Sequence, residues 1–197
     1  MKILIDNGHG ENTPGKRSPK WADGTQLFEW QYTREIAQRV EAELRKHGID
    51  VERIVKESVD IPLSERCKRA NAIAAKAGVK NCLLVSIHNN AATGTARGWE
   101  IHTYLKSSKA ADDYATVFWN EAKNILPQGT KMRRSSPQEP PAWKSNFAIL
   151  RDTVCPAVLT ENLFMDNPED CRYLLSNEGK AAITKIHVQS ILKIAGK

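Results

Sequence analysis

The sequence lacks several features that define other classes of protein. No apolar stretch approaches the roughly 20 residues that a membrane-spanning helix requires, so we expect no insertion into a membrane. No signal peptide is recognisable, because Lys2 is followed by only three apolar residues before Asp6. The four cysteines form no Cys-x-x-Cys pair and, in a chain of 197 residues, do not indicate a disulfide framework. Internal repeats and low-complexity tracts are missing as well, which leaves an ordinary globular chain.

The composition is that of one folded domain with a sizeable core. Apolar residues make up 41% of the chain and charged residues 26%, which argues against disorder. Cys82 and Cys155 lie in apolar runs and are predicted to be buried thiols. The net charge of +6 suits an acidic partner such as a nucleic acid, an anionic membrane or an anionic cell-wall polymer. Because the basic residues are scattered, a solvated and mildly basic surface is an equally good explanation.

Short apolar runs alternate with helical patterns along the chain. The longest helical pattern has an apolar residue at every fourth position from Phe28 to Leu44, and Gly48 ends it. Ser64 is a predicted N-cap and Gly78 a predicted stop for the next helix. The strands are expected at 2–6, 49–55, 82–88, 98–105, 147–151 and 155–162, and the helices at 28–47, 62–78, 109–126 and 178–195. This alternation predicts an α/β fold, with a twisted, mostly parallel sheet of about six strands and helices on both faces.

Four residues stand where an open α/β sheet binds its ligands, beyond the carboxyl ends of the strands. His9 follows the first strand and lies between two glycines, an unusual setting for a structural histidine. His88 ends the nearly continuous apolar run "CLLVSIH", and Glu161 ends the run "CPAVLTE". Glu29 opens the first long helix, directly after a loop rich in glycine and proline. Residues distant in the chain can therefore meet at one edge of the sheet.

Two histidines and a glutamate are a common ligand set for catalytic zinc, which keeps a fourth position open for water. Zinc lowers the pKa of that water from 15.7 to about 7, and a second carboxylate can then act as general base. Glu161 is the better candidate for the base, which leaves Glu29 as the possible ligand. The alternatives are structural: each histidine could be a hydrogen-bonded strand-end residue, and Glu29 a first-turn acid favoured by the helix dipole.

Six segments in order also resemble a known family. They are "IDNGHG", "LFEW…EIA", "RCKRAN", "SIHNNA", "GWEIHTY" and "PAVLTENLFMDN". Together they are similar to the zinc-dependent N-acetylmuramoyl-L-alanine amidases of bacterial cell separation and phage lysis. The pattern of that family is Asp-x-Gly-His-Gly, a glutamate opening a helix, Arg-x-x-x-Ala-Asn, Ser-x-His-x-Asn, Gly-x-Glu and Glu-x-Gly-Phe-x-x-Asn. The resemblance covers nearly the whole chain.

The resemblance implies a function and a role for each matched residue. His9, Glu29 and His88 would bind one zinc ion, and Glu161 would be the catalytic glutamate. The reaction would be hydrolysis of the amide between N-acetylmuramic acid and the L-alanine of peptidoglycan. Asn90 and Glu100 match the family's Ser-x-His-x-Asn and Gly-x-Glu segments, and a substrate-binding or supporting role is implied for both.

The chain departs from the family pattern at two positions. Asn7 stands where proline or a small residue is common, and Leu163 replaces the glycine of Glu-x-Gly-Phe-x-x-Asn. Neither change removes a ligand, but Leu163 lies close to Glu161 and bears on peptide specificity. Trp21, Trp99 and Trp143 are no more than possible groove residues, since single tryptophans usually pack in a core. The proline-rich stretch 127–145 is either a rim of the site or a plain connector.

Residues 1–197 are expected to form the catalytic domain alone, without a separate wall-binding domain, as in an endolysin. Such an enzyme would be a monomer that stays in the cytoplasm until release, or leaves by a non-classical route, and acts at the cell wall or in the periplasm. Its positive charge would then favour the anionic wall. Three other functions remain open: a zinc peptidase acting on stem peptides, a non-catalytic peptidoglycan-binding module and a nucleic-acid binder. The last predicts a basic stripe with interleaved aromatics, which the sequence does not contain.

Overall fold

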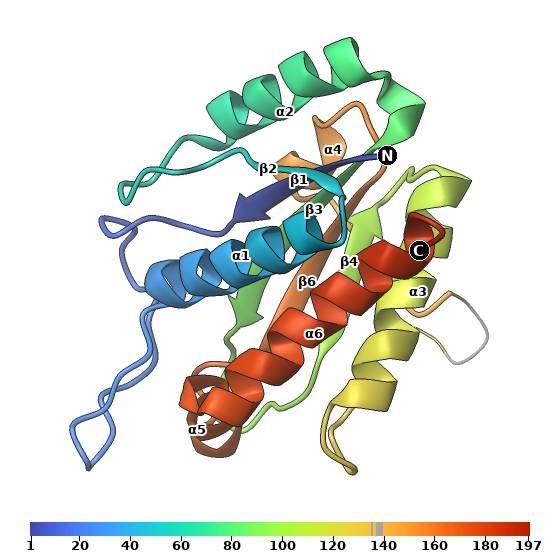
Figure 1. Ribbon diagram of the computed structural model, residues 1–197. Helices are drawn as coiled ribbons and strands as arrows, with labels where there is room; N and C mark the ends of the chain where they lie inside the picture. Colours follow the sequence, from blue (N-terminus) through green and yellow to red (C-terminus); the bar gives the residue numbers. More distant parts are fainter. Residues whose placement is uncertain (135, 137–139) are drawn as a thin grey trace.

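A mixed six-stranded sheet forms the centre of the molecule (Figure 1). The computed structural model describes residues 1–134, 136 and 140–197. The strands in this part of the chain are β1 (Lys2–Asn7), β2 (Asp50–Arg53), β3 (Cys82–Asn90), β4 (Glu100–Tyr104), β5 (Trp143–Ser145) and β6 (Ala157–Phe164). Their order is β2-β1-β3-β6-β4-β5, and every neighbouring pair is parallel except β4 and β6. The predicted α/β class and the mostly parallel sheet are confirmed.

Helices cover both faces of the sheet, as predicted. They are α1 (Glu29–Lys46), α2 (Leu63–Ala77), α3 (Lys109–Ile125), α4 (Ala148–Arg151), α5 (Pro168–Leu175) and α6 (Asn177–Ile194), with a 3-10 turn at Val79–Asn81. Figure 1 shows α2 on one side of the sheet and α1 and α6 on the other. None of the helices in the described part of the chain is long and apolar enough to cross a membrane.

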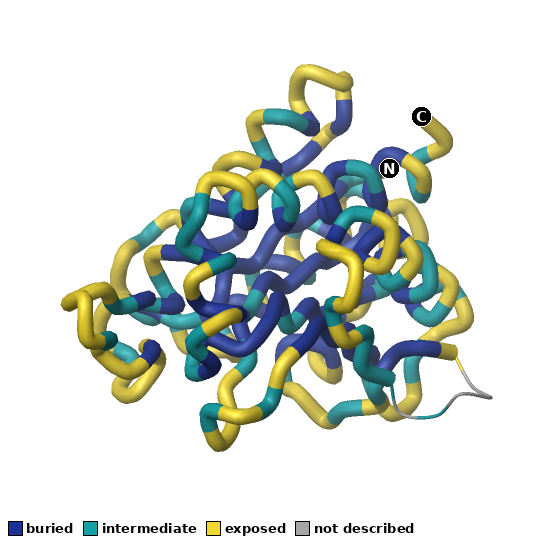
Figure 2. The backbone as a smooth tube through the Cα atoms, turned by 90° about the horizontal axis from the view of Figure 1, so that it is seen from below, coloured by how far each residue is buried: buried dark blue, intermediate teal, exposed yellow. Residues whose placement is uncertain are grey.

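The central strands are buried on both faces. Successive side chains point to opposite sides of the sheet, and helices cover each side. Ile3 and Leu83 pack into the larger cluster with α1, α3 and α6, whereas Leu4 and Leu84 pack into the smaller cluster with α2 and α4. Figure 2 shows the same arrangement, with buried backbone at the centre and exposed backbone around it. All four cysteines are free and buried, so the prediction for Cys82 and Cys155 is confirmed.

Helix α1 follows from its sequence pattern. Tyr32, Ile36, Val40 and Leu44 recur every four residues and are all buried against the sheet. The helix ends where Gly48 adopts a φ of +67° and its N–H donates to the carbonyl of Arg45. Glycine adopts this left-handed conformation at little cost, so the predicted stop has a physical basis.

The segment 147–151 is not a strand as predicted. It forms α4, in which Ile149 and Leu150 are buried in the cluster of α2. A short apolar run fits a strand and a buried helical turn equally well, and packing against α2 decides between them. The strand of this region is Trp143–Ser145, which pairs with β4 inside the stretch expected to be a connection. Residues 135 and 137–139 of that stretch lie outside the described residues.

Two helix starts were also predicted wrongly or missed. The N-cap of α2 is Pro62 rather than Ser64, and no side chain caps this helix. Helix α5 was missed although the sequence contains its start signals. Asn167 caps it by accepting from the backbone N–H groups of Glu169 and Asp170, and proline stands at the first helical position.

Candidate metal and catalytic site

Three predicted ligands converge where β1 and β3 approach the start of α1. The Nε2 atom of His9 lies 3.4 Å from one carboxylate oxygen of Glu29, and the Nδ1 atom of His88 lies 3.3 Å from the other. One ligand atom from each residue lies within 4.8 Å of those of the other two. The two imidazole rings are perpendicular, with their centroids 5.0 Å apart. Tetrahedral zinc bonds to nitrogen and oxygen at about 2 Å, and a set this compact fits one ion.

The two glycines beside His9 are explained by close packing. A Cβ atom on Gly8 would lie 2.4 Å from the ring of His88, and one on Gly10 would lie 2.0 Å from the backbone of Asp60. His9 itself has a φ of +62°, which costs energy in a non-glycine residue. The backbone therefore turns sharply here so that the imidazole faces Glu29. A side chain at Gly8 would displace the ring of His88, and one at Gly10 would displace the loop of Asp60 that packs against this turn.

Arg66 holds this turn from inside the molecule. Its side chain is 2% exposed. Its two terminal nitrogens donate at 2.6–3.1 Å to side-chain oxygens of Asp6 and Asp60 and to the carbonyls of Asn7 and His9. A buried guanidinium with this many charged and polar partners fixes the backbone path of the loop.

Glu29 is buried at 1% exposure, yet one of its oxygens has no hydrogen bond within the described part of the chain. The other oxygen accepts from the backbone N–H of Asn89 at 2.9 Å. Burial alone would raise the pKa of Glu29, but the hydrogen bond with His88 and the charges of the two histidines outweigh it and lower the pKa. A buried carboxylate oxygen facing two imidazoles is suited to a cation.

The pKa values of the two histidines shift in opposite directions. Burial lowers the pKa of His9 to about 4, so its imidazole is neutral at physiological pH and keeps a lone pair for a metal. For His88 burial also opposes the charge, but the hydrogen bond and charge of Glu29 overcome it and raise the pKa. Metal ligands must be deprotonated, so the binding of a metal ion here would compete with protonation of His88.

Glu161 lies beside the three ligands on the neighbouring strand. It is the register partner of His88 across β3 and β6, and of Glu100 across β6 and β4. Register partners point to the same side of a sheet, so the three side chains form a row. Burial, together with the charges of Glu29 and Glu100, raises the pKa of Glu161 to about 8 against the opposing charge of His88. A carboxyl group whose pKa lies near neutral pH can accept a proton and then return it.

Glu100 is the outer member of this row, and Asn90 hydrogen-bonds to it. Neither residue lines the hollow in front of the site that is described below. The amide of Asn90 donates to Glu100 at 3.1 Å, and Arg133 donates to the other oxygen of Glu100. The ring of His102 lies 3.3 Å from Glu100 and hydrogen-bonds to Ser145 at 2.8 Å. The sequence gave no signal for Arg133, which belongs to no motif, and the sequence analysis assigned no role to His102.

A hollow of about 360 Å³ opens in front of the site. It is lined by His9, Lys16, Leu63, His88, Asn146, Phe147, Ala148, Ile149, Leu159 and Glu161. Leu63 and Phe147 are 52% and 40% exposed, unusually high values for large apolar side chains. None of the three tryptophans considered from the sequence lines it. Trp99, for example, is fully buried and donates to Asn162.

The leucine that replaces the family's glycine lies in a β-bulge. His88 pairs with Glu161, but two residues further along β3 Asn90 already pairs with Phe164, so β6 contains one extra residue. Leu163 lies in this interval with a φ of +63°, the conformation that glycine adopts most readily. Its side chain is 2% exposed and packs in the core, away from the hollow. The departure therefore places strain in the backbone and adds nothing to the lining of the hollow.

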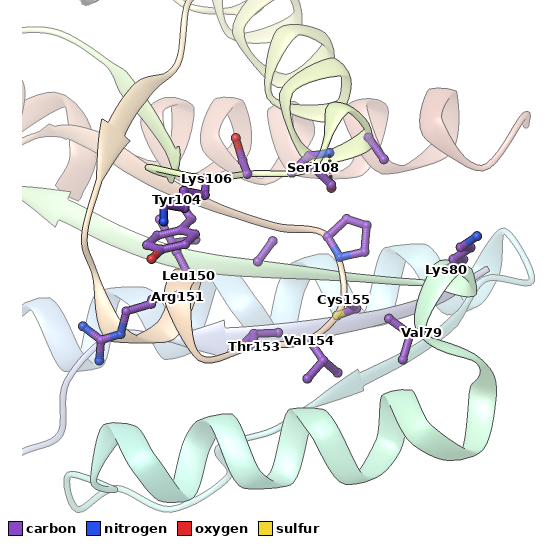
Figure 3. A pocket seen from close by; sticks show the side chains of 15 residues that line it. Val79, Lys80, Tyr104, Lys106, Ser108, Leu150, Arg151, Thr153, Val154 and Cys155 are labelled. Carbon is purple, nitrogen blue, oxygen red and sulfur yellow. Dashed lines mark hydrogen bonds between the residues drawn. The ribbon is translucent and has the colours of Figure 1, made fainter.

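A larger hollow, of about 570 Å³, lies where β3 and β6 begin (Figure 3). Figure 3 shows Val79, Lys80, Val154 and Cys155 among its lining side chains. Among the described residues, no aspartate, glutamate or histidine lines it. Burial raises the pKa of Cys155 to about 11, which keeps this thiol protonated and unreactive.

The fold and the site together define an α/β chain in which His9, Glu29 and His88 form a cluster that could hold a metal ion (the cradle), with Glu161 on the neighbouring strand. The family model described as N-acetylmuramoyl-L-alanine amidase matches residues 3–193, and the chain belongs to this family. The chain is 30% identical to the endolysin of Bacillus phage SPP1 over 98% of its own length, and 27% identical to the amidase CwlM of Bacillus licheniformis, also over 98%. It spans 65% of the endolysin and 68% of CwlM, about two thirds of each.

A solved structure supports the fold independently. The amidase AmiC2 of Nostoc punctiforme superposes with a TM-score of 0.80, covering 100% of this chain and 98% of that one at 24% sequence identity. At this level of identity the likeness concerns the fold alone. The resemblance seen in the sequence is thus confirmed at the level of the family.

Proposed function

We propose that this chain is a zinc-dependent N-acetylmuramoyl-L-alanine amidase, which hydrolyses the amide between the lactyl group of N-acetylmuramic acid and L-alanine. The observation that carries the proposal is the position of Glu161, a half-buried side chain next to the cradle of His9, Glu29 and His88, with one buried carboxylate oxygen that has no hydrogen-bond partner within the described residues. Membership of the family supports the choice of substrate bond. Peptidoglycan is then the partner, and the cell wall is the place of action.

The cradle fits zinc by its chemistry and its geometry. His9 and His88 offer imidazole nitrogens, and Glu29 offers a carboxylate oxygen that has no other partner within the described residues. When bound, zinc would supply a Lewis acid and lower the pKa of a water molecule. The chain supplies the fixed geometry, because Arg66 and the packing of Gly8 against His88 leave the ligands little freedom.

Glu161 is the proposed proton carrier. Its carboxylate accepts a proton from the attacking water while the water oxygen bonds to the lactyl carbonyl carbon. The bond from carbon to the alanine nitrogen then breaks, and Glu161 delivers its proton to that nitrogen. The products are the muramic acid carboxylate and a stem peptide with a free amino group on L-alanine. Asn90, Arg133 and His102 act through Glu100, which in turn neighbours Glu161.

Purified protein on isolated peptidoglycan tests the proposal. The reaction is run with a chelator, with zinc added back, and with Glu161→Ala, and released products are identified by mass. We expect stem peptides beginning with a free L-alanine, released with zinc and lost in the variant. Cuts at other bonds of the stem would instead indicate a zinc peptidase. Binding to the wall without any release would indicate a non-catalytic module and overturn the mechanism.

A further inference from the structure

Lys16 reaches the catalytic hollow from the loop between the first two ligands. The loop closes like a hairpin, because Arg17 bridges to Phe28 and the N–H of Ser18 donates to the carbonyl of Leu27 at 2.8 Å. One residue before this bridge, the carbonyl of Lys16 accepts from the N–H of Glu29 at 3.1 Å. The backbone of Lys16 is therefore tied to a ligand of the cradle, and its side chain lines the hollow with His9 and Glu161.

Lys16 is the one cationic side chain among the described residues lining this hollow, and it has no acidic partner within ion-pair distance. Other cations near the site are already engaged: Arg66 is bound to Asp6 and Asp60, and Arg133 to Glu100. The charge of Lys16 nevertheless acts across the hollow, since it lowers the pKa of both His9 and Glu161 among other, larger influences. A cationic side chain is thus available in the hollow that contains His9 and Glu161.

The chemistry of the substrate indicates what this group meets. The sugar side of the scissile bond is neutral: hydroxyls, an acetamide and the lactyl carbonyl itself. On the peptide side, the residue after L-alanine is a D-glutamate linked through its side chain. It carries a free α-carboxylate, which some cell walls convert to an amide. This carboxylate is the anionic group nearest to the bond, two residues into the leaving peptide.

Other parts of the lining of the hollow are apolar. Leu63 at the start of α2 and Phe147 before α4 present exposed apolar surface there. A substrate chain in the hollow would therefore meet both the cation of Lys16 and apolar surface. Such a mixed lining orients a ligand that carries charge on one side only.

We propose that Lys16 is a specificity-determining residue that pairs with the α-carboxylate of the second stem residue, so that the enzyme prefers D-isoglutamate to D-isoglutamine at this position. The inference rests on the proposed amidase function. A long, flexible lysine side chain suits this task, since it follows a mobile peptide as a point charge. An exposed ion pair contributes at most about 1 kcal/mol, which sets the expected preference at about fivefold.

Binding is measured first, without turnover. Two synthetic ligands, N-acetylmuramoyl-L-alanyl-D-isoglutamate and the corresponding D-isoglutamine, are titrated by calorimetry into zinc-loaded Glu161→Gln protein. We expect the carboxylate ligand to bind about fivefold more tightly. Adding Lys16→Met should abolish the preference, and Lys16→Arg should preserve it. Lys20→Met removes another exposed lysine of the same loop, outside the hollow, and should leave the preference unchanged.

Turnover with active protein gives the second readout. Lys16→Met should raise KM for the carboxylate substrate about fivefold, with kcat nearly unchanged and little effect on the amide substrate. Equal affinity of the parent protein for both ligands would overturn the assignment. An equal fall of kcat on both substrates would overturn it too, because Lys16 would then stabilise the transition state. If the unaltered protein releases no L-alanine-ended peptides at all, the proposed function itself has failed instead.

Discussion

The two hollows at opposite ends of the sheet differ in the titratable side chains that line them. The larger, of about 570 Å³, is lined by apolar, lysine, arginine and hydroxyl side chains and contains no acid or imidazole. The smaller, of about 360 Å³, is lined by two imidazoles, the half-buried Glu161 and Lys16, which has no acidic partner among the described residues. Volume therefore does not identify the site. The converging titratable groups do, because parallel strands bring their carboxyl ends and the residues after them to one edge.

The largest expected effect would separate the two hollows by activity. Glu161→Gln removes the proton carrier while keeping the shape, so we expect hydrolysis to fall by a factor on the order of 10² to 10⁴. Zinc content should stay near one ion per chain, because the cradle is intact. Lys106→Met changes an exposed cation in the larger hollow and should alter the rate by less than about twofold. Release of peptides from peptidoglycan, with metal analysis in parallel, measures both.

The comparison would break in one clear way. If Lys106→Met lowered the rate as much as Glu161→Gln, the larger hollow would take part in the reaction. If Glu161→Gln lost its zinc, the fall in rate would report the cradle and not the proton carrier.

A second prediction tests why the smaller hollow is so tightly built. Gly8→Ala places a Cβ atom 2.4 Å from the ring of His88, which must then move away from Glu29. We expect the affinity for zinc to fall on the order of 10- to 100-fold, the usual cost of disturbing the support of a metal ligand. Competition with a chromophoric chelator measures this. Gly24→Ala is the control, since a Cβ atom there meets nothing within 4 Å, although its φ of +82° adds local strain. An unchanged zinc affinity in Gly8→Ala would refute the packing argument.

A third prediction concerns a buried histidine that belongs to neither hollow. His187 in α6 is fully buried, hydrogen-bonds to Thr160 and the carbonyl of Ile183, and has its pKa lowered by burial to about 4. The unfolded chain takes up a proton near pH 6.5 and the folded chain does not. Stability is therefore complete above pH 6.5 and falls as the pH drops from there to about 4.

The loss attributable to His187 is at most about 3 kcal/mol, because a shift of one pKa unit corresponds to 1.36 kcal/mol. Urea unfolding at pH 7.5 and pH 4.5, compared between the parent protein and His187→Gln, isolates this contribution. His47→Gln, at an exposed position, is the control. If His187→Gln lost as much unfolding free energy between pH 7.5 and pH 4.5 as the parent protein does, the assignment to His187 would be contradicted. Zinc is left out of all samples so that the cradle titrates equally in each.

Much of this organisation could be predicted from the sequence, because local signals coincide with it. The apolar periodicity of α1 and the apolar runs of β3 and β6 predicted a mostly parallel sheet. They also predicted that His9, His88 and Glu161 lie at one edge of it. Glu29 was different, since a first-turn acid is common. The residue set left Glu29 as a possible ligand, and the family resemblance favoured that role over a helix first-turn acid.

What could not be predicted depends on contacts between distant segments. Arg133 reaches Glu100 from a loop without any recognisable motif, and α4 replaces a predicted strand because packing against α2 decides an ambiguous run. The position of Lys16 in the hollow depends on the hairpin closure of a loop that looks irregular in sequence. The bulge at Leu163 left only one trace, a leucine at the family's glycine position.

The smallest expected effect compares the bulge with an ordinary position of the neighbouring strand. Leu163→Ala and Leu163→Gly both remove a buried side chain, at a cost of about 2–5 kcal/mol. Only glycine also relieves the left-handed backbone at φ +63°, which costs alanine about 1 kcal/mol. We therefore expect the glycine variant to be the more stable of the two by about 1 kcal/mol in urea unfolding. At Leu84, in β3, the order should reverse, because glycine in a regular strand gives up backbone entropy without relieving strain. If alanine were the more stable at both positions, the bulge would store no strain, and the leucine at this position would need another explanation.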